Sequence, residues 1–442
     1  MQDYKKQFKG KKITVMGLGL LGGAVNDIIF LAKNRADLTV TDLKNAKELK
    51  SSIKKLKKYL KIKFVLGKHR MEDFKKADLI LQPGNVPIDS PYLAEAGKNK
   101  IPIYVSESLF AKYASEVMMI GVTGTRGKSM VTALIYEILS KNLKKKKIYF
   151  GGNVRNVSTL ALLGKVKSGD VVVMELDSWA LHGMGNIKKS PYISIFTSFM
   201  PDHMNYYKNS MENYFNDKAN IFKYQKKDDI LIIRPDMKKF IKSKNVKGKL
   251  IIVNAKNVDK YNFFVPGKFQ KENLACAVEV AKQFKIPDSK ITQALKNFKG
   301  LEGRLQYIKT VKGVKIYNDN NATTPEATIA GIEALKNNKR NIILICGGAD
   351  KKLPLDDFVK VVNKYCKAVI MIPGTGTNIL SSRKLKVESY KVENLNKAVE
   401  KAKKLAKTED IILFSPAFAS FGQFNNEYER NDLFLKIIKK LK

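Results

Sequence analysis

Short apolar runs alternate along this chain with longer segments whose apolar residues recur at helical spacing. Lys12–Gly17 is an apolar run that ends in glycine, and a segment with helical spacing follows it. The same order starts again at Val117–Val122, which leads through a glycine-rich turn into a predicted helix over Met130–Ser140. A strand, a glycine turn and a helix in this order are typical of parallel sheets with crossover helices.

A third block begins after Gly300, where Leu305–Tyr317 is predicted to form a hairpin. We therefore expect an α/β protein of three domains, each with a mostly parallel sheet flanked by helices. The expected limits are 1–115 for a Rossmann-like domain, 116–300 for a P-loop domain and 301–442 for a second Rossmann-like domain. The pattern also predicts a helix over Met211–Tyr224 and strands at Leu38–Asp42, Ile101–Val105, Val171–Leu176, Tyr192–Thr197, Ile230–Ile233, Asn341–Cys346, Ala368–Ile372 and Ile411–Phe414.

The length of 442 residues agrees with several domains, and a hydrophobic share of 44% excludes a disordered chain. Cys276, Cys346 and Cys366 lie in apolar runs without metal-ligand spacing, so we expect reduced thiols in the core. No apolar run approaches the ~18 residues of a membrane-spanning helix, and the first residues lack the apolar stretch of a signal peptide. We expect a cytoplasmic protein without membrane insertion.

Basic residues outnumber acidic ones by 82 to 41, which gives a formal net charge of +41. Such a charge can indicate nucleic-acid binding, and the run Lys144–Lys147 is its best local support. However, only 9 of the basic residues are arginine, which sequence-reading proteins favour, and no aromatic residues for base stacking interrupt this run. We expect small-molecule partners and no nucleic acid, and keep a basic P-loop protein acting on nucleic acid as the alternative.

The segment Gly121–Ser129 reads GVTGTRGKS, follows an apolar strand and opens a helix. Glycines at such a junction let backbone N–H groups turn toward phosphate oxygens, and the helix N-terminus adds partial positive charge. Lys128 would reach the terminal phosphates of ATP, and the Ser129 hydroxyl would join a Mg²⁺ shell. An ordinary glycine turn is the alternative to this ATP site.

The earlier glycine segment, Gly17–Gly22, also follows a strand, and Asp42 ends the next one. An acid about 20 residues after the last glycine is where dinucleotide folds bind a ribose hydroxyl. These residues alone leave NAD, another nucleotide-linked ligand and simple packing open. Glu175 lies at the end of the predicted strand Val171–Leu176, and His203 follows the strand Tyr192–Thr197. A carboxylate with an imidazole there could hold Mg²⁺ beside the phosphate loop. Structural roles for both are the alternative.

Eight motifs occur in one order along the chain and together resemble the Mur ligase family, and within it the MurD type. They are TGTRGKS, ELDSW, PDHMNYY, YFNDKANIF, LEGR, YNDNNATTPEAT, GGADKK and SPAFASFGQF. The resemblance runs from Lys12 to about Phe434 and implies three domains that bind a UDP-sugar, ATP and an amino acid, in that order. It implies that Gly17–Gly22 binds UDP rather than NAD.

The resemblance also implies roles for single positions. Catalysis would depend on Lys128, Glu175, His203 and Lys218, and two Mg²⁺ ions would be held by Ser129, Glu175, His203 and Lys218, the last as a carbamate. The implied ATP-binding residues are Gly124, Thr125, Arg126, Gly127, Lys128, Ser129, Asn273, Arg304 and Asp319. The implied UDP-sugar-binding residues are Gly17, Leu18, Gly19, Asp42, Lys44, Gly84 and Asn153, and the implied amino-acid-binding residues are Thr323, Lys351 and Ser420.

The activity implied by the resemblance is peptidoglycan precursor synthesis. An ATP-dependent ligase of this type joins D-glutamate to UDP-N-acetylmuramoyl-L-alanine through an acyl phosphate, and we expect a monomer. L-glutamate or another amino acid stays open as the acceptor, because the amino-acid site departs from the family pattern. Asn321 stands where the family has lysine, Glu427 where it has an aromatic residue and Asn431 where it has glycine.

Overall fold

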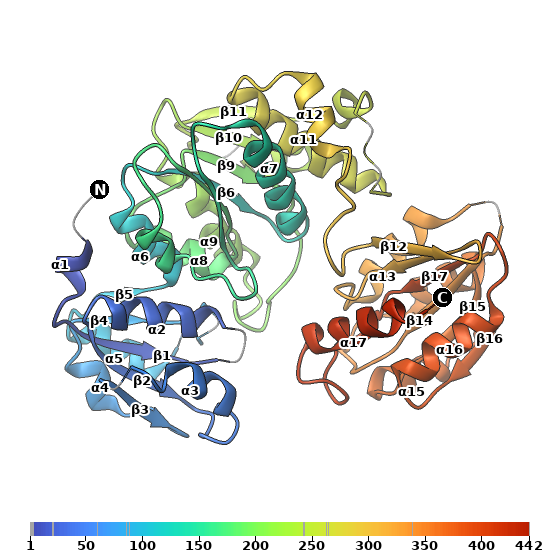
Figure 1. The fold of residues 1–442 in the computed structure, drawn as a ribbon, viewed down its shortest axis with the longest axis horizontal. Helices are drawn as coiled ribbons and strands as arrows, with labels where there is room; N and C mark the ends of the chain where they lie inside the picture. Colours follow the sequence, from blue (N-terminus) through green and yellow to red (C-terminus); the bar gives the residue numbers. More distant parts are fainter. Residues whose placement is uncertain are drawn as a thin grey trace. The chain divides into compact units, whose positions relative to one another are not determined.

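The computed structural model describes residues 4–19, 22–59, 61–84, 86–87, 89–241, 244–261, 263, 265–337 and 339–441. These residues form three β-sheets with flanking helices (Figure 1). The chain divides into two compact units, Met1–Tyr261 with Glu272–Leu295, and Asn262–Lys271 with Lys296–Lys442. Two sheets lie in the first unit and one in the second, so the three-domain α/β architecture is confirmed. The exact domain limits stay a prediction.

The first sheet is parallel and has the strand order β3-β2-β1-β4-β5. β1 (Lys12–Met16) lies between β2 (Asp37–Asp42) and β4 (Leu79–Leu81). The strand order reverses at β1, and ligands of such sheets bind beyond the carboxyl end of the strand at this point. The turn Gly17–Gly22 begins there, although Leu20 and Leu21 lie outside the described residues. The other elements are β3 (Ile62–Leu66), β5 (Ile103–Tyr104), α1 (Tyr4–Phe8), α2 (Gly23–Lys33), α3 (Lys50–Leu56), α4 (Met71–Lys75), α5 (Pro91–Lys98) and α6 (Ser106–Tyr113).

The second sheet is also parallel, in the order β11-β10-β9-β6-β8-β7. β6 (Met118–Thr123) lies between β9 (Ile193–Phe196) and β8 (Val171–Glu175), so the phosphate loop leaves the sheet at its own point of reversal. The remaining strands are β7 (Ile148–Gly152), β10 (Ile230–Ile233) and β11 (Lys249–Ile252). The helices are α7 (Lys128–Asn142), α8 (Ser178–Asn186), α9 (Met211–Lys223), α10 (Lys238–Ile241), α11 (Lys268–Gln283), α12 (Asp288–Leu295), η1 (Leu160–Gly164), η2 (Pro235–Met237) and η3 (Ala255–Val258).

The third sheet has the order β12-β13-β17-β14-β15-β16 and is parallel except for its first pair. β12 (Gln306–Val311) and β13 (Val314–Asn318) form the predicted antiparallel hairpin. β17 (Ile411–Phe414) lies between β13 and β14 (Ile342–Cys346), so the loops after these three strands share one edge. The other elements are β15 (Cys366–Met371), β16 (Glu388–Lys391), α13 (Pro325–Leu335), α14 (Asp356–Tyr365), α15 (Thr375–Ser381), α16 (Leu395–Leu405) and α17 (Glu427–Lys439).

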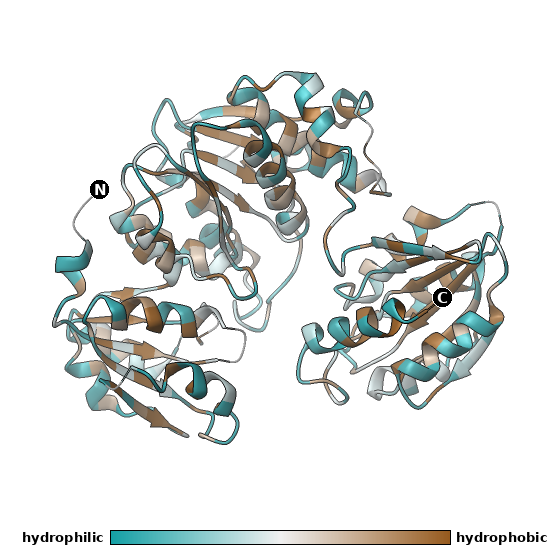
Figure 2. Ribbon diagram, viewed as in Figure 1, coloured by the Kyte–Doolittle hydropathy of each residue, from teal (hydrophilic) through white to brown (hydrophobic). Residues whose placement is uncertain are grey.

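Apolar side chains cover both faces of the third sheet. α13 and α14 pack on one face, and α16 and α17 pack on the other. Figure 2 shows many of the strands in brown and long stretches of the helices in teal. Cys276, Cys346 and Cys366 are free and buried, as predicted. No helix in the described part of the chain is long and apolar enough to cross a membrane.

Candidate active site

The phosphate loop joins β6 to α7 through a turn that requires glycine at two positions. Gly124 has a φ of +143°, and a Cβ there would lie 2.1 Å from the hydroxyl oxygen of Thr197. Gly127 has a φ of +89°, and a Cβ there would lie 2.5 Å from the Asn273 side-chain oxygen. Gly127 directly precedes α7, so the loop ends at the N-terminus of this helix. Unpaired N–H groups and the helix dipole favour an anion there. This geometry suits a phosphate group.

Polar groups after the neighbouring strand β9 hold the loop in this shape. The N–H of Thr125 donates to Ser198 O at 2.8 Å, and the N–H of Arg126 donates to Ser198 Oγ at 2.9 Å. The Thr197 hydroxyl donates to Arg126 O at 2.5 Å, and the Thr125 hydroxyl donates to Met200 O at 3.1 Å. The backbone of the loop is thus held in place by hydrogen bonds to the residues that follow the next strand.

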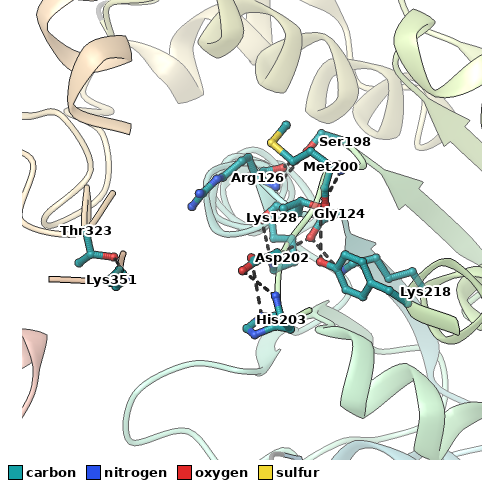
Figure 3. Close-up of polar contacts among 12 residues, drawn as sticks. Gly124, Arg126, Lys128, Ser198, Met200, Asp202, His203, Lys218, Thr323 and Lys351 are labelled. Carbon is teal, nitrogen blue, oxygen red and sulfur yellow. Dashed lines mark hydrogen bonds and ion pairs between the residues drawn. The ribbon is translucent and has the colours of Figure 1, made fainter. Parts of the chain in front are cut away.

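Two lysine side chains converge on one carbonyl oxygen of the loop (Figure 3). Lys128 Nζ donates to Gly124 O at 2.9 Å, and Lys218 Nζ donates to the same oxygen at 3.0 Å. Lys218 stands on α9 and is only 2% exposed. Its burial, and secondly the charge of Lys128, lower the pKa of Lys218 to about 7. At neutral pH a large share of Lys218 is therefore an uncharged amine.

Groups at neighbouring strand ends surround these lysines. Glu175 ends β8 and is 7% exposed, and its charge raises the pKa of Lys218 against the effect of burial. His203 follows β9, and partial burial lowers its pKa, while Asp202 opposes the shift and Lys218 adds to it. The structure therefore brings Glu175, His203, Lys128 and Lys218 together, as the sequence predicts, and their catalytic roles stay a prediction.

The donor atoms beside the loop fit a Mg²⁺ ion. Ser129 is the second residue of α7, Glu175 offers a carboxylate, and the lowered pKa of His203 keeps its imidazole neutral and able to bind a metal. The described residues contain no group of three or more His, Cys, Asp or Glu side chains that could hold a metal by itself. Mg²⁺ commonly binds through one or two carboxylates together with water and substrate phosphates. A site with the single carboxylate of Glu175 agrees with this coordination preference.

Asp42 shapes the first glycine turn through its carboxylate. Oδ2 accepts hydrogen bonds from the N–H groups of Leu18 at 2.8 Å and Gly19 at 3.2 Å, and Oδ1 accepts one from the N–H of Lys44 at 2.9 Å. Gly17 has a φ of +87°, which favours glycine. These residues, with Gly17, were all predicted to bind the UDP-sugar, and the structure places them around the Asp42 carboxylate.

Of the other two predicted UDP-sugar residues, Gly84 lies against a residue of the phosphate-loop domain and Asn153 belongs to that domain. A Cβ on Gly84 would lie 2.8 Å from Cβ of Trp179, so a larger residue does not fit there without movement. The N–H of Asn153 donates to Glu175 O at 2.9 Å, which places Asn153 beside a predicted metal ligand. Asn273, the predicted adenine contact, is buried beside the phosphate loop.

In the second unit, Asp319 is buried and bonded at both carboxylate oxygens. Oδ1 accepts from the N–H of Leu305 at 2.9 Å, and Oδ2 accepts from the Ser415 hydroxyl at 2.8 Å. Burial raises the pKa of Asp319 to about 7, and these bonds and the charge of Arg304 oppose the shift. Asp319 therefore fixes the loop after β13, and Arg304, which is exposed, lies within its electrostatic reach.

The three predicted amino-acid-binding residues come from the loops after β13, β14 and β17. Lys351 Nζ donates to Thr323 Oγ1 at 2.9 Å (Figure 3). The N–H of Ala349 donates to Ala419 O at 2.9 Å, and the N–H of Ala419 donates back at 3.0 Å. Ala419 directly precedes Ser420, so the loop that carries Lys351 is tied to the loop that carries Ser420.

Two features of the site were not predicted from the sequence. Thr197 and Ser198 hold the phosphate loop. Their position at the end of a predicted strand was visible in the sequence, but the sequence did not show that this strand lies beside β6. The ring of Trp179 lies with its centroid 4.7 Å from that of His203 and also packs against Gly84. Trp179 is the single tryptophan of the chain, and its place between two predicted sites could not be read from its position in ELDSW.

Comparison with protein families finds three matches in sequence order. Residues 11–105 match the Mur ligase MurD-like N-terminal domain, 122–280 match the Mur ligase middle domain, and 303–418 match the Mur ligase glutamate ligase domain. The first two matches cover the two glycine turns, and the third covers Arg304, Asp319, Thr323 and Lys351.

Full-length relatives and solved structures agree with these matches. The chain is 35% identical over 460 residues to the UDP-N-acetylmuramoylalanine--D-glutamate ligase of Borreliella afzelii, covering 98% of this chain and 99% of that protein. It is 32% identical to the ligase of the same name from Thermoanaerobacter pseudethanolicus, covering 99% and 100%.

Among solved structures, UDP-N-acetylmuramate-alanine ligase MurC from Thermotoga maritima matches with a TM-score of 0.63 at 19% identity, over 98% of this chain and 100% of that one. MurF ligase from the same organism, solved with ADP, matches with a TM-score of 0.59 at 16% identity, over 100% and 99%. These two structures share the fold. With its three domain matches and its full-length relatives, the chain belongs to the Mur ligase family, in the branch that has a MurD-like N-terminal domain.

Proposed function

We propose that this protein is an ATP-dependent ligase that joins D-glutamate to the alanine carboxylate of UDP-N-acetylmuramoyl-L-alanine and releases ADP and phosphate. The observation that carries the proposal is the 35% identity, along 98% of the chain, to a relative named for this reaction. The phosphate loop supports it, because the loop presents Lys128 and the N-terminus of α7 to an anion.

The first step joins two anions. An oxygen of the substrate carboxylate forms a bond to the γ-phosphorus of ATP, the bond to the bridging oxygen breaks, and ADP leaves an acyl phosphate behind. Lys128 and the N–H groups of the loop would reduce the repulsion and orient the two groups in line. The step needs no nucleophile from the protein.

The second step forms the amide bond. The amine of the amino acid, having lost one proton, attacks the carbonyl carbon of the acyl phosphate, and the tetrahedral intermediate expels phosphate while a second proton passes to solvent. We propose that Lys351, Thr323 and Ser420 hold the carboxylates of this amino acid. The Lys351–Thr323 hydrogen bond of 2.9 Å supports the grouping.

Two Mg²⁺ ions would supply positive charge between ATP and the substrate carboxylate when bound. Ser129, Glu175, His203 and Lys218 would hold them, with Lys218 as a carbamate. The lowered pKa of Lys218, to about 7, supports this because only an uncharged amine adds CO₂. We also propose that the protein acts as a monomer in the cytoplasm, where ATP and UDP-sugars are made.

Phosphate release from ATP tests the function. The full chain is incubated with Mg²⁺, ATP and UDP-N-acetylmuramoyl-L-alanine, and D-glutamate, L-glutamate and other amino acids are compared as acceptors. Release that depends on both the UDP-sugar and D-glutamate supports the proposal. If phosphate is released only with L-glutamate or another amino acid, the protein is a ligase with a different acceptor. If no amino acid supports release, the proposed function is overturned.

A further inference from the structure

Arg430 is the largest side chain among those that the described residues bury completely. It stands on α17, it has no solvent exposure, and its burial lowers its pKa only to about 10, so it is charged at neutral pH. Buried cations in proteins usually pair with a carboxylate. Within the described ranges of the chain, no carboxylate forms an ion pair with Arg430, although the charge of Glu427 opposes the lowering of its pKa.

The guanidinium group instead joins two loop segments through neutral oxygen atoms. Nε donates to Asn320 Oδ1 at 2.8 Å, and one terminal nitrogen donates to Asn320 O at 3.0 Å. The other terminal nitrogen donates to Phe418 O at 3.4 Å, a long bond. Asn320 lies in the loop after β13 that carries Thr323, and Phe418 lies in the loop after β17 that carries Ser420.

Further hydrogen bonds connect the two loop segments and the residues next to Asn320. The Asn320 amide donates to Asn321 Oδ1 at 3.1 Å, and the N–H of Ala417 donates to Ala322 O at 2.9 Å. The segment from Asn320 to Thr323 is therefore joined to the loop after β17 by a backbone hydrogen bond and, through the Arg430 side chain, by a second connection. Loss of the guanidinium group would loosen the position of Thr323 relative to Ser420.

The charge of Arg430 has an electrostatic consequence at the same place. An amino-acid acceptor brings an α-carboxylate, and glutamate brings a second carboxylate. Lys351 is the cation that bonds to Thr323, whereas Asn321 is neutral. The oxygens that accept hydrogen bonds from the guanidinium are all neutral. The charge of Glu427 acts on the group without forming an ion pair, so it offsets only part of the positive potential, and the rest acts on an anion bound above the two loops. A desolvated charge acts more strongly over such a distance than an exposed one.

We propose that Arg430 is a positioning residue for the acceptor amino acid, which aligns the loops that carry Thr323 and Ser420 and adds positive potential beneath the bound carboxylate. This proposal rests on the ligase function proposed above. It concerns any amino-acid acceptor, because each of them has an α-carboxylate.

The test uses the full chain and begins with the amino acid that gives the fastest phosphate release with the unchanged protein. If no amino acid works, the ligase function fails; if one works, Arg430 is tested with it whatever its identity. Arg430→Met removes the charge while keeping apolar volume, which buried sites often tolerate in folding. We expect the KM for the amino acid to rise at least tenfold, with the KM values for ATP and the UDP-sugar within twofold.

Two further variants separate positioning from general damage. Lys436→Gln removes an exposed cation from the same helix, and we expect all three KM values within twofold of the unchanged protein. Asn321→Lys, combined with Arg430→Met, restores a cation to the loop, and we expect the KM for the amino acid to fall at least fivefold. A merely structural role of Arg430 would not produce this recovery.

The result that overturns the proposal is a folded Arg430→Met protein whose KM for the amino acid stays within twofold, or whose three KM values rise together. Thermal unfolding of each variant shows whether it is folded. Arg430→Lys keeps the charge and serves where Arg430→Met does not fold. A selective rise in the KM for the amino acid, smaller than tenfold, then supports the proposal, and an equal rise for all three substrates contradicts it.

Discussion

The burial of Lys218 predicts a chemical modification that can be measured directly. Its amine adds CO₂ to form a carbamate and release a proton, and only the uncharged amine can do so. With a pKa of about 7, about half of the Lys218 amines are uncharged at pH 7. An exposed lysine with the ordinary pKa of about 10.4 is uncharged in about one molecule in 2,500 at that pH. Lys218 therefore offers roughly a thousand times more reactive amine than a surface lysine.

The assay is ¹³C NMR of the full chain in ¹³C-labelled bicarbonate. We expect one carbamate signal at pH 8 that is lost in Lys218→Met and retained in Lys223→Met, which changes an exposed lysine near the end of the same helix. Acidification from pH 8 to pH 6 lowers the uncharged fraction from about nine-tenths to about one-tenth, so the signal and the ligase rate should fall together.

Two results would refute this reasoning. The first is the absence of a Lys218-dependent carbamate signal at pH 8 in saturating bicarbonate. The second is a Lys218→Met protein that keeps the rate of the unchanged protein, because the carbamate would then have no role in the reaction. A signal that persists in Lys218→Met would belong to another amine, and the N-terminal amine is the first to examine because its pKa is also low.

Three further changes are expected to have measurable effects. Lys128→Ala should lower kcat/KM for ATP by about 100-fold or more, or ~3 kcal/mol of transition-state stabilisation, and a rate within tenfold would contradict its role. Gly124→Ala should abolish ATP binding in calorimetry, because the new Cβ would lie 2.1 Å from the Thr197 hydroxyl; unchanged affinity would show that the loop can adjust. Asp27 accepts hydrogen bonds from Ser106 at 2.9 Å and Ser158 at 2.5 Å, yet burial raises its pKa from 3.8 to about 6. The folded state therefore binds the extra proton between these pH values, and stability is lost as pH rises through about 6. Relative to Asp27→Asn, the unchanged protein should lose ~2 kcal/mol of unfolding free energy between pH 4 and 7 in urea titrations, and parallel curves would disprove this.

The sequence was sufficient to predict the strands that both faces of a sheet bury. Val171–Leu176 and Ile411–Phe414 were predicted as strands and correspond to β8 and β17, whose residues are all buried. The edge strands β11 and β16 each expose three of their four residues and were not predicted. β16 has no apolar run, and the apolar run in β11 is only four residues long with its following valine, too short to separate a strand from a loop by periodicity. An edge strand is defined by its single neighbour, and that is a property of the assembled sheet.

The phosphate loop could be predicted from the sequence, but the residues that hold it in shape could not. Glycine, lysine and serine at fixed spacing predict the loop because its backbone needs those residue types within one turn. Thr197 and Ser198, which bond to Arg126, lie about seventy positions further along the chain. Only the adjacency of β9 and β6 makes them part of the loop, and no local pattern specifies that adjacency.

The first glycine turn shows where spacing alone was ambiguous. Asp42 lies where a dinucleotide fold would use the acid for a ribose hydroxyl, which left NAD open. In the structure its carboxylate accepts three backbone N–H groups, from Leu18, Gly19 and Lys44. The acid therefore has a role in the turn itself, and its position 20 residues after the last glycine carries less information about the ligand than the three domain matches do.

The lysine excess leads to a related conclusion about charge. A formal net charge of +41 says little about chemistry, because most cations lie in water, where the interaction of two charges 4 Å apart is only about 1 kcal/mol. Lys218 and Arg430 are among the few that are completely or almost completely buried. Desolvation makes the amine of Lys218 reactive and leaves the potential of Arg430 uncancelled by solvent. In the sequence, Lys218 was singled out only through the motif YFNDKANIF, and no pattern singled out Arg430. The paired variants Lys218→Met with Lys223→Met, and Arg430→Met with Lys436→Gln, therefore test whether burial, rather than the number of charges, decides which of the 82 basic residues act.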